Sequence, residues 1–122
     1  MTIPVLYVDD DADIREIAEM ALSLDPDLEV RTSASGSDAL ALVEQWKPQL
    51  ILLDFMMPDL DGPATLRLLR QNSSLDEVPV VFITARTSSR DVESLLASGA
   101  AGVLAKPFDV MTLAAQCREF VP

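Results

Sequence analysis

Five polar residues of this sequence each stand at the end of a short apolar run or directly after it. They are Asp9, Asp10, Asp54, Thr84 and Lys106. If a fold brings three carboxylates together, they repel one another unless one is protonated or a divalent cation neutralises them. Oxygen ligands without histidine or cysteine favour a hard ion such as Mg²⁺. A carboxylate nucleophile beside Mg²⁺, a hydroxyl and an ammonium group is suited to phosphoryl transfer.

Asp54 ends the most apolar of these runs. Four aliphatic residues, Leu50 to Leu53, precede it, and Pro58 breaks the run soon after. A short continuous apolar run predicts a strand that is buried on both faces, as in a parallel sheet covered by helices. An ionised carboxylate is costly to bury without a partner. Asp54 therefore needs a cation, a hydrogen-bond donor or a reaction to explain its position.

The remaining sequence predicts strands alternating with helices. The apolar runs predict five strands, at residues 3–8, 28–32, 50–54, 79–84 and 102–106. Apolar residues at helical spacing predict five helices between and after them, marked by Ile14, Ile17, Ala18 and Ala21; by Ala39, Leu42, Val43 and Trp46; by Leu66 and Leu69; by Val92, Leu95 and Leu96; and by Val110, Leu113, Ala114 and Cys117. Asp11 or Asp13 is expected to cap the first helix, and Pro63 to begin the third.

Such alternation predicts one α/β domain over residues 1–122, a single five-stranded parallel sheet with five helices on both faces. The carboxyl ends of the strands then lie along one edge, where open α/β sheets bind their ligands. Taken singly, each of the five polar residues has an ordinary explanation as a helix cap or a turn residue. Their joint placement at the ends of four strands favours a site.

Composition excludes several functions. The chain of 122 residues has a net charge of −11, which makes nucleic-acid binding by this domain improbable, because phosphate backbones need basic surfaces. No histidine is present, so histidine metal sites and histidine-dependent triads are excluded, and the single cysteine, Cys117, excludes an internal disulfide. Neither a signal peptide nor a membrane span is evident, and a cytoplasmic location is expected.

The same residues, in this order and spacing, resemble the response-regulator receiver domain of two-component signalling. The matching pieces are Val8-Asp9-Asp10, Leu53-Asp54 with Met57-Pro58 and Gly62, Ile83-Thr84-Ala85, and Lys106-Pro107-Phe108. The resemblance extends over essentially the whole chain. It implies a flavodoxin-like, CheY-like (βα)5 fold and a phosphorylated signalling switch rather than an enzyme with a released product.

By this resemblance Asp54 is the phosphoacceptor, Lys106 pairs with the phosphoryl oxygens, and Thr84 moves to hydrogen-bond them. Asp10 and Asp54 would bind Mg²⁺ directly, Asp9 would act through water, and Met56 would offer only its backbone carbonyl. The resemblance also implies a cis peptide bond before Pro107, although cis bonds are uncommon before proline in general.

The resemblance implies protein partners as well. The phosphoryl donor would be a sensor histidine kinase, a histidine phosphotransfer protein or a small phosphodonor. The output would be a downstream protein target or an effector domain, and a homodimer could form on phosphorylation. A partner surface on the fourth and fifth helices is implied by the resemblance alone.

One position departs from the family pattern. Many receiver domains have Tyr or Phe three residues before the lysine of the fifth strand, and this chain has Val103 there. Switching is therefore expected to rely more on the loop from Thr84 to Arg90 and on the helix after it. Met56 and Arg86, each two residues after a site residue, are expected to tune the lifetime of the phosphoryl group.

Three other functions remain alternatives. An aspartate-nucleophile phosphatase would need a second acid two residues after Asp54, where Met56 stands. A flavodoxin-like cofactor binder would need a Ser/Thr/Gly-rich phosphate loop after the first strand, where three aspartates stand. A receiver-like interaction module that is never phosphorylated normally lacks a site residue, and none is missing here.

Overall fold

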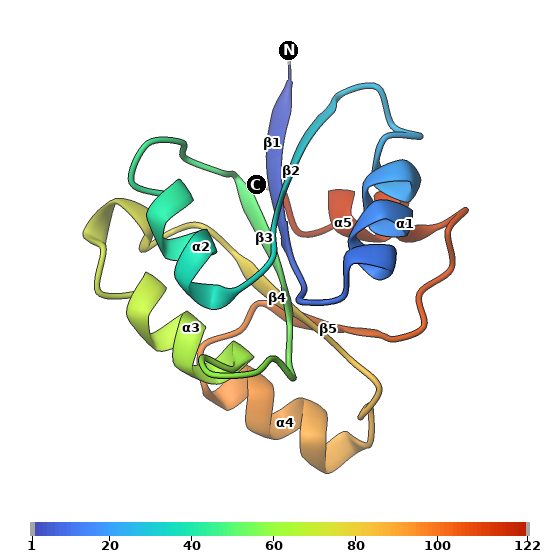
Figure 1. The fold of residues 1–122 in the computed structure, drawn as a ribbon. Coiled ribbons are helices and arrows are strands. Elements are labelled where there is room, and N and C mark those ends of the chain that lie inside the picture. Colours follow the sequence, from blue (N-terminus) through green and yellow to red (C-terminus); the bar gives the residue numbers. More distant parts are fainter. Residues whose placement is uncertain (1, 122) are drawn as a thin grey trace.

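The computed structural model describes residues 2–121, so the two end residues of the predicted domain, 1 and 122, lie outside the described chain. It contains one parallel sheet in the order β2-β1-β3-β4-β5 (Figure 1). The strands are β1 (Ile3–Val8), β2 (Leu28–Ser33), β3 (Leu50–Asp54), β4 (Val80–Thr84) and β5 (Gly102–Ala105). The helices are α1 (Ala12–Leu22), α2 (Gly36–Leu42), α3 (Gly62–Leu69), the 3₁₀ turn η1 (Ser73–Leu75), α4 (Ser89–Ala97) and α5 (Leu113–Arg118). The predicted five-stranded α/β fold is confirmed.

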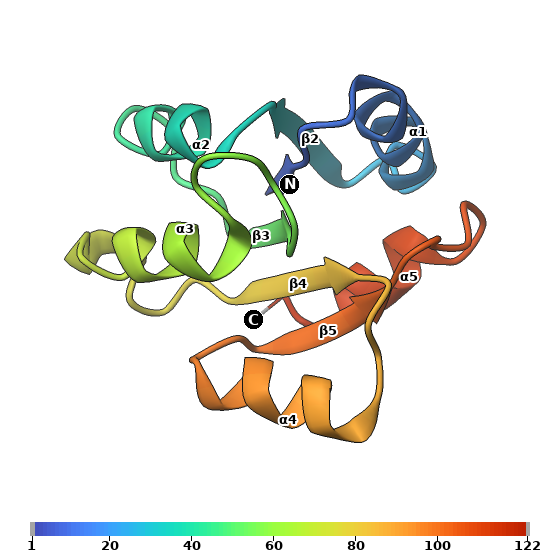
Figure 2. The same ribbon diagram turned by 60° about the horizontal axis from the view of Figure 1, so that its bottom comes forward.

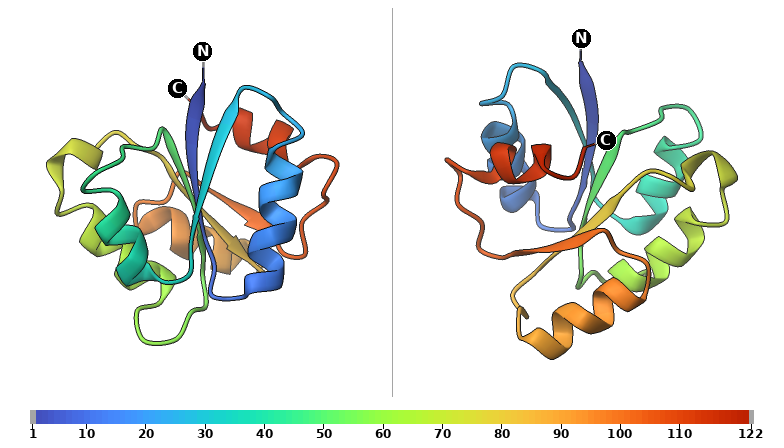
Figure 3. Two further views of the ribbon diagram at one scale, coloured as in Figure 1. Left: turned by 45° about the horizontal axis from the view of Figure 1, so that its top comes forward. Right: turned by 180° about the vertical axis from the view of Figure 1, so that it is seen from behind.

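The helices form one layer on each face of the sheet. Figures 2 and 3 show α1 and α5 on one face and α2, α3 and α4 on the other. Alternate residues of each central strand enter the two cores, because successive side chains of a strand point to opposite faces. In β1, for example, Leu6 and Val8 pack toward α2 to α4, and Val5 and Tyr7 pack toward α1 and α5. Burial on both faces explains the uninterrupted apolar runs of β3 and β4.

The helices α1 to α4 begin at side-chain caps, whereas α5 has none. Asp11, the first of the two predicted candidates, caps α1 by accepting the backbone N–H groups of Asp13 and Ile14. Asp61 caps α3 in the same way through the N–H of Ala64. These caps satisfy donors that would otherwise lack partners at each helix start.

Two helices are shorter than their apolar spacing predicts. α2 ends at Leu42, because the N–H groups of Glu44 and Gln45 then donate three residues back in a tighter turn. The indole N–H of Trp46, beyond this end, donates to Glu29 of β2. α5 begins at Leu113 rather than at Val110, because Asp109 holds a turn by accepting the N–H of Met111. β5 also ends one residue early, at Ala105.

The loop between β3 and α3 is drawn tightly against the end of β3. The N–H of Gly62 donates to the carbonyl of Phe55 over 3.0 Å. A Cβ atom at Gly62 would lie only 2.7 Å from the backbone oxygen of Asp54, so no larger residue fits without moving the strand end. The predicted cis bond between Lys106 and Pro107 is present. Within residues 2–121, no helix combines the length and apolarity needed to cross a membrane.

Candidate functional site

Backbone hydrogen bonds hold the strand ends in line with one another. The N–H groups of Asp9, Phe55 and Lys106 each donate to the last residues of a neighbouring strand, over 3.1, 3.1 and 2.9 Å. The sheet ladder thus continues one residue past the strands. Because these bonds fix the backbone on either side of the site, the side chains of Asp9, Asp54 and Lys106 start from rigid positions at one edge.

Three carboxylates meet at this edge. Oxygen atoms of Asp9, Asp10 and Asp54 lie within 4.8 Å of one another, with Asp9 and Asp54 buried and Asp10 exposed. Three acidic oxygen donors at this separation are the ligand chemistry of a hard divalent cation. The donor set therefore fits such an ion, and Asp10 gives it an exposed side of approach.

Lys106 bridges two of these carboxylates. Its Nζ atom lies 3.0 Å from Oδ2 of Asp9 and 3.4 Å from Oδ2 of Asp54. Desolvation lowers the pKa of Lys106, but the hydrogen bond to Asp9 and the charges of both aspartates outweigh it, so its pKa is raised. Lys106 is therefore a cation, and it pairs with two of the three carboxylates.

Asp9 has two further donors that composition and spacing did not reveal. The hydroxyl of Tyr7 donates to Oδ2 of Asp9 over 3.0 Å, and the N–H of Asp11 donates to Oδ1 over 3.0 Å. Arg15 also donates to the backbone carbonyl of Asp9. Burial, followed by the charge of Asp9, raises the pKa of Tyr7, so the phenol stays neutral and keeps its proton. The spacing of residues 7 and 9, two apart on one strand, is the signal that could have suggested the contact.

Thr84 lies at the edge of the site, and its hydroxyl bonds to the loop after β4 rather than to the carboxylates. Its hydroxyl accepts the backbone N–H of Arg86 over 3.0 Å. Thr84 nevertheless lines one cavity of about 240 Å³ together with Asp54 and Lys106. Met56 and Arg86 border the same cavity, and the Met56 side chain is 66% exposed.

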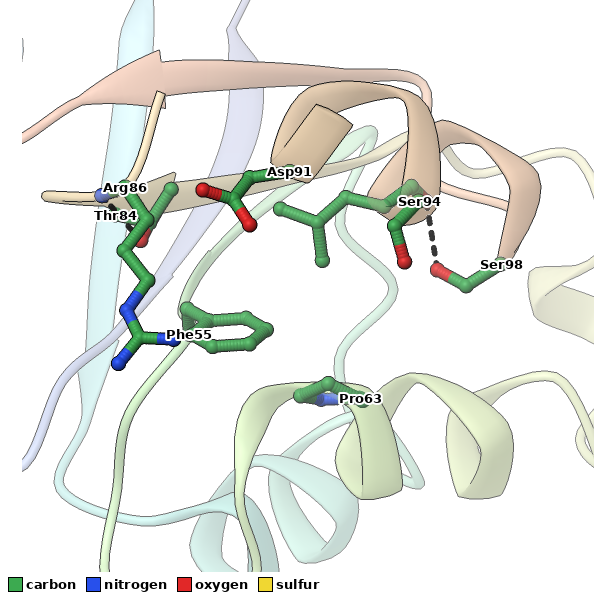
Figure 4. A pocket seen from close by; sticks show the side chains of 8 residues that line it. Phe55, Pro63, Thr84, Arg86, Asp91, Ser94 and Ser98 are labelled. Carbon is green, nitrogen blue, oxygen red and sulfur yellow. Dashed lines mark hydrogen bonds between the residues drawn. The ribbon is translucent and has the colours of Figure 1, made fainter. Parts of the chain in front are cut away.

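A second cavity, of about 230 Å³, also borders Thr84 (Figure 4). Phe55, which follows β3, and Pro63 of α3 line one part of it, and Asp91, Ser94 and Ser98 of the α4 region line another. Arg86 borders both cavities. The start of the loop from Thr84 to α4 therefore borders two cavities.

The surroundings of Asp54 disfavour its charged form. Burial, followed by the charge of Asp9, raises the pKa of Asp54 to about 6, and Lys106 lowers it only in part. A carboxylate whose charged form is disfavoured in this way is one that a bound cation would stabilise.

A parallel α/β sheet with an acidic cluster and a lysine at its carboxyl edge defines the class of protein. The family model for the response regulator receiver domain matches residues 5–118 of this chain. The chain therefore belongs to the response regulator receiver domain family, the signalling domain of two-component systems, as the sequence resemblance predicted.

Relatives and solved structures agree with this assignment. The chain is 37% identical to a probable transcriptional regulator, ycf27, of Porphyridium aerugineum over 94% of this chain and 46% of that protein. It is also 37% identical to the DNA-binding response regulator MtrA of Mycobacterium tuberculosis, over 93% of this chain and 48% of that protein. The chain spans about half the length of the curated relatives it matches. The structure of the chemotaxis response regulator CheY4 of Vibrio cholerae superposes with a TM-score of 0.91, at 31% identity over 99% of this chain and 100% of that one.

The site residues expected from the sequence fall into two groups. In the first group, Asp9, Asp10 and Asp54 cluster together and Lys106 contacts Asp9 and Asp54. Thr84 forms the second, because it shares only a cavity with Asp54 and Lys106. The roles given to these residues stay predictions, as does the role of the Met56 carbonyl.

Replacement of Asp54 by Asn is expected to stabilise the fold at pH 7 without divalent ions. The folded pKa of Asp54, about 6, lies above its unfolded value of about 4. The wild type therefore loses stability as the pH rises through this interval, because the unfolded chain gives up its proton first. Asp54→Asn should raise the free energy of unfolding at pH 7 by about 1–2 kcal/mol, with the gain vanishing below about pH 4.

Urea denaturation at several pH values in the presence of a chelator measures this difference. Asp76→Asn, which changes an exposed acid far from the site, is the matched control and should show no such pH dependence. A gain at Asp54 that is equal at pH 4 and pH 7 would contradict the electrostatic explanation.

Proposed function

We propose that this chain is a phosphoacceptor receiver domain over residues 1–122, in which phosphorylation of Asp54 switches binding to a partner protein. The observation that supports this most strongly is the position of Asp54. Its side chain is only 6% exposed, yet it lines an open cavity together with Lys106 and Thr84. A buried carboxylate that faces a cavity and a cation has the surroundings of a nucleophile.

In the proposed reaction an oxygen of Asp54 attacks the phosphorus of the donor. The new bond joins this oxygen to phosphorus, and the bond that breaks joins phosphorus to the nitrogen of a phosphohistidine, which leaves as the imidazole. Lys106, which already reaches Oδ2 of Asp54, would balance the charge of the phosphoryl oxygens. Thr84 would give up its bond from the Arg86 N–H and donate its hydroxyl to the phosphoryl group.

We propose Mg²⁺ as the cation of the acidic cluster. Asp10 and Asp54 would bind it directly, with the Met56 carbonyl, and Asp9 would act through water. A bound Mg²⁺ would neutralise negative charge on the transferring phosphoryl group. The side chain of Met56 is apolar and 66% exposed, so only its backbone carbonyl would offer an oxygen to the cation.

The proposed partners follow from the family. A sensor histidine kinase, a histidine phosphotransfer protein or a small phosphodonor would supply the phosphoryl group, in the cytoplasm. Since several relatives are named transcriptional or DNA-binding regulators and are about twice as long, an effector domain on the same polypeptide is one proposed output. A separate protein target, or a homodimer formed on phosphorylation, is the other. Nucleic-acid binding is not proposed for this acidic domain.

Switching would use the loop from Thr84 to Arg90 and α4. Val103 is only partly buried and packs into the core on the α4 side, and it has no ring that could swing when Thr84 moves. The cavity between this loop, Phe55 and α4 offers room for Arg86 and its neighbours to shift instead (Figure 4). A partner surface that includes α4 would sense this shift, and α5 remains part of the proposed surface by family resemblance.

Incubation with acetyl phosphate and Mg²⁺ is expected to add about 80 Da, the mass of one phosphoryl group, to the intact protein. The adduct should be absent in Asp54→Asn and should be lost from the wild type when Mg²⁺ is chelated. Intact-mass spectrometry measures it directly. An adduct that persists in Asp54→Asn would mean that another residue is the acceptor, and a folded wild type that forms none with any donor would favour an unphosphorylated interaction module.

Replacement of Met56 by Asn is expected to shorten the lifetime of the phosphoryl group. Met56 borders the cavity that contains Asp54, and a polar amide there would hold water near the phosphorus where a thioether does not. We expect the dephosphorylation rate to rise about threefold to tenfold. Arg86→Ala, which opens the opposite border and removes a cation, should also change the rate.

The rate is measured by the decay of the phosphorylated mass after the donor is removed. Met111→Asn is the matched control, because Met111 is 77% exposed and lies outside this cavity. Unchanged rates in both Met56→Asn and Arg86→Ala would show that neither residue tunes the lifetime.

A further inference from the structure

Tyr7 is the one buried polar side chain of the site to which the proposed function gives no task. It is the single tyrosine of the chain and is fully buried in the core beneath α1 and α5. Its hydroxyl nevertheless reaches the acidic cluster, at 3.0 Å from Oδ2 of Asp9. A phenylalanine would fill the same space, so the hydroxyl itself calls for an explanation.

The hydrogen-bond acceptor positions of Asp9 explain why a hydroxyl is present at Tyr7. Asp9 is fully buried, and an ionised carboxylate can accept about four hydrogen bonds. Tyr7 and Lys106 both donate to Oδ2, and the N–H of Asp11 donates to Oδ1. Oδ2 is thereby saturated by the protein, and the one acceptor position that remains is on Oδ1. The orientation of the carboxylate is fixed by these three donors.

The hydroxyl of Tyr7 also affects how closely Lys106 approaches each of its two carboxylate partners. Nζ of Lys106 lies 3.0 Å from Asp9 and 3.4 Å from Asp54. Oδ2 of Asp9 already accepts a hydrogen bond from the Tyr7 hydroxyl, so this oxygen attracts the ammonium group of Lys106 less strongly. Without that donor, Lys106 would be drawn toward Asp9 and away from Asp54.

Packing in the core holds the ring of Tyr7 in this position. It packs edge-on against Phe108, with ring centroids 6.4 Å apart and an interplanar angle of 76°. Phe108 follows Lys106 by two residues, so the ring contact and the ion pair tie the same chain segment to β1. The tyrosine therefore connects the core beneath α1 and α5 to the charged edge of the sheet.

We propose that Tyr7 is a positioning residue that acts through Asp9. Its hydroxyl holds Oδ2 of Asp9 toward the core, leaves Oδ1 available to the cation site, and keeps Lys106 shared between Asp9 and Asp54. Its effect on phosphorylation rests on the proposed function, whereas its effect on cation binding does not depend on phosphoryl transfer.

Tyr7→Phe tests this proposal through Mg²⁺ binding as well as through phosphorylation. We expect the dissociation constant for Mg²⁺, measured by calorimetry or by NMR titration, to rise about threefold to tenfold, because Asp9 loses a donor that fixes it. At saturating Mg²⁺ the rate of labelling by acetyl phosphate should also fall severalfold, because Lys106 moves from Asp54. Cys117→Ala removes buried atoms from the same core without touching Asp9, and it should leave both values unchanged.

The other outcomes are equally decisive. A folded Tyr7→Phe protein that binds Mg²⁺ as the wild type does would overturn the proposal, and so would an equal loss in Cys117→Ala, which would point to packing alone. Selective ¹³C labelling of the single tyrosine provides a second measurement in the wild type. Its ring signal should shift when Mg²⁺ binds, and an unmoved signal would also overturn the proposal. A wild type that binds Mg²⁺ but forms no adduct would refute the proposed function while the tyrosine effect on binding is still measured.

Discussion

The structure depends on one unbalanced arrangement of charge, in which a single ammonium group faces three carboxylates. Lys106 follows the edge strand β5, yet its side chain reaches Asp9 beyond β1, past the ends of both β4 and β3. The ion pairs thus tie the ends of β1, β3 and β5 together at one edge. Burial, followed by the charge of Asp9, raises the pKa of Asp54, and Lys106 offsets this only in part. A divalent cation would remove the imbalance, and so would partial proton uptake.

The fold makes this arrangement possible by the regularity of its sheet. All four strand pairs are parallel, so the strands end at the same edge without any residue having to bend toward the site. The close approach of Gly62 to the backbone of Asp54 keeps the next loop against the end of β3. Below the edge, Tyr7 extends the hydrogen-bonded network into the core, where its ring is fixed by packing. Core packing and site geometry are therefore parts of one structure.

Much of this could be predicted from the sequence. The aliphatic run before Asp54 indicates a strand buried on both faces, and the alternation of strands and helices fixes which strand ends share an edge. Those two inferences placed Asp9, Asp54 and Lys106 together, although they lie far apart in the chain. The cis bond before Pro107 was predicted through the family resemblance and is present.

The rest depends on tertiary contacts that no local pattern contains. Trp46 has the spacing of a helical residue, but its indole finds Glu29 on β2, and α2 ends early. The sequence places Tyr7 two residues before Asp9, but only the fold shows that its hydroxyl donates to the Asp9 carboxylate. The hydrogen bond between Thr84 and the N–H of Arg86 likewise follows from the shape of the loop. Where several hydrogen-bond partners are within reach of a side chain, the sequence alone does not show which one it contacts.

A crystal structure of the protein grown with Mg²⁺ tests the central claim most directly. If the excess negative charge at the edge of the sheet exists to hold a cation, one ion should bind oxygen atoms of Asp10 and Asp54 and the carbonyl of Met56, while Lys106 stays paired with Asp9. Crystals that contain Mg²⁺ with no ion between these carboxylates, or with Lys106 alone filling the space between them, would contradict the account.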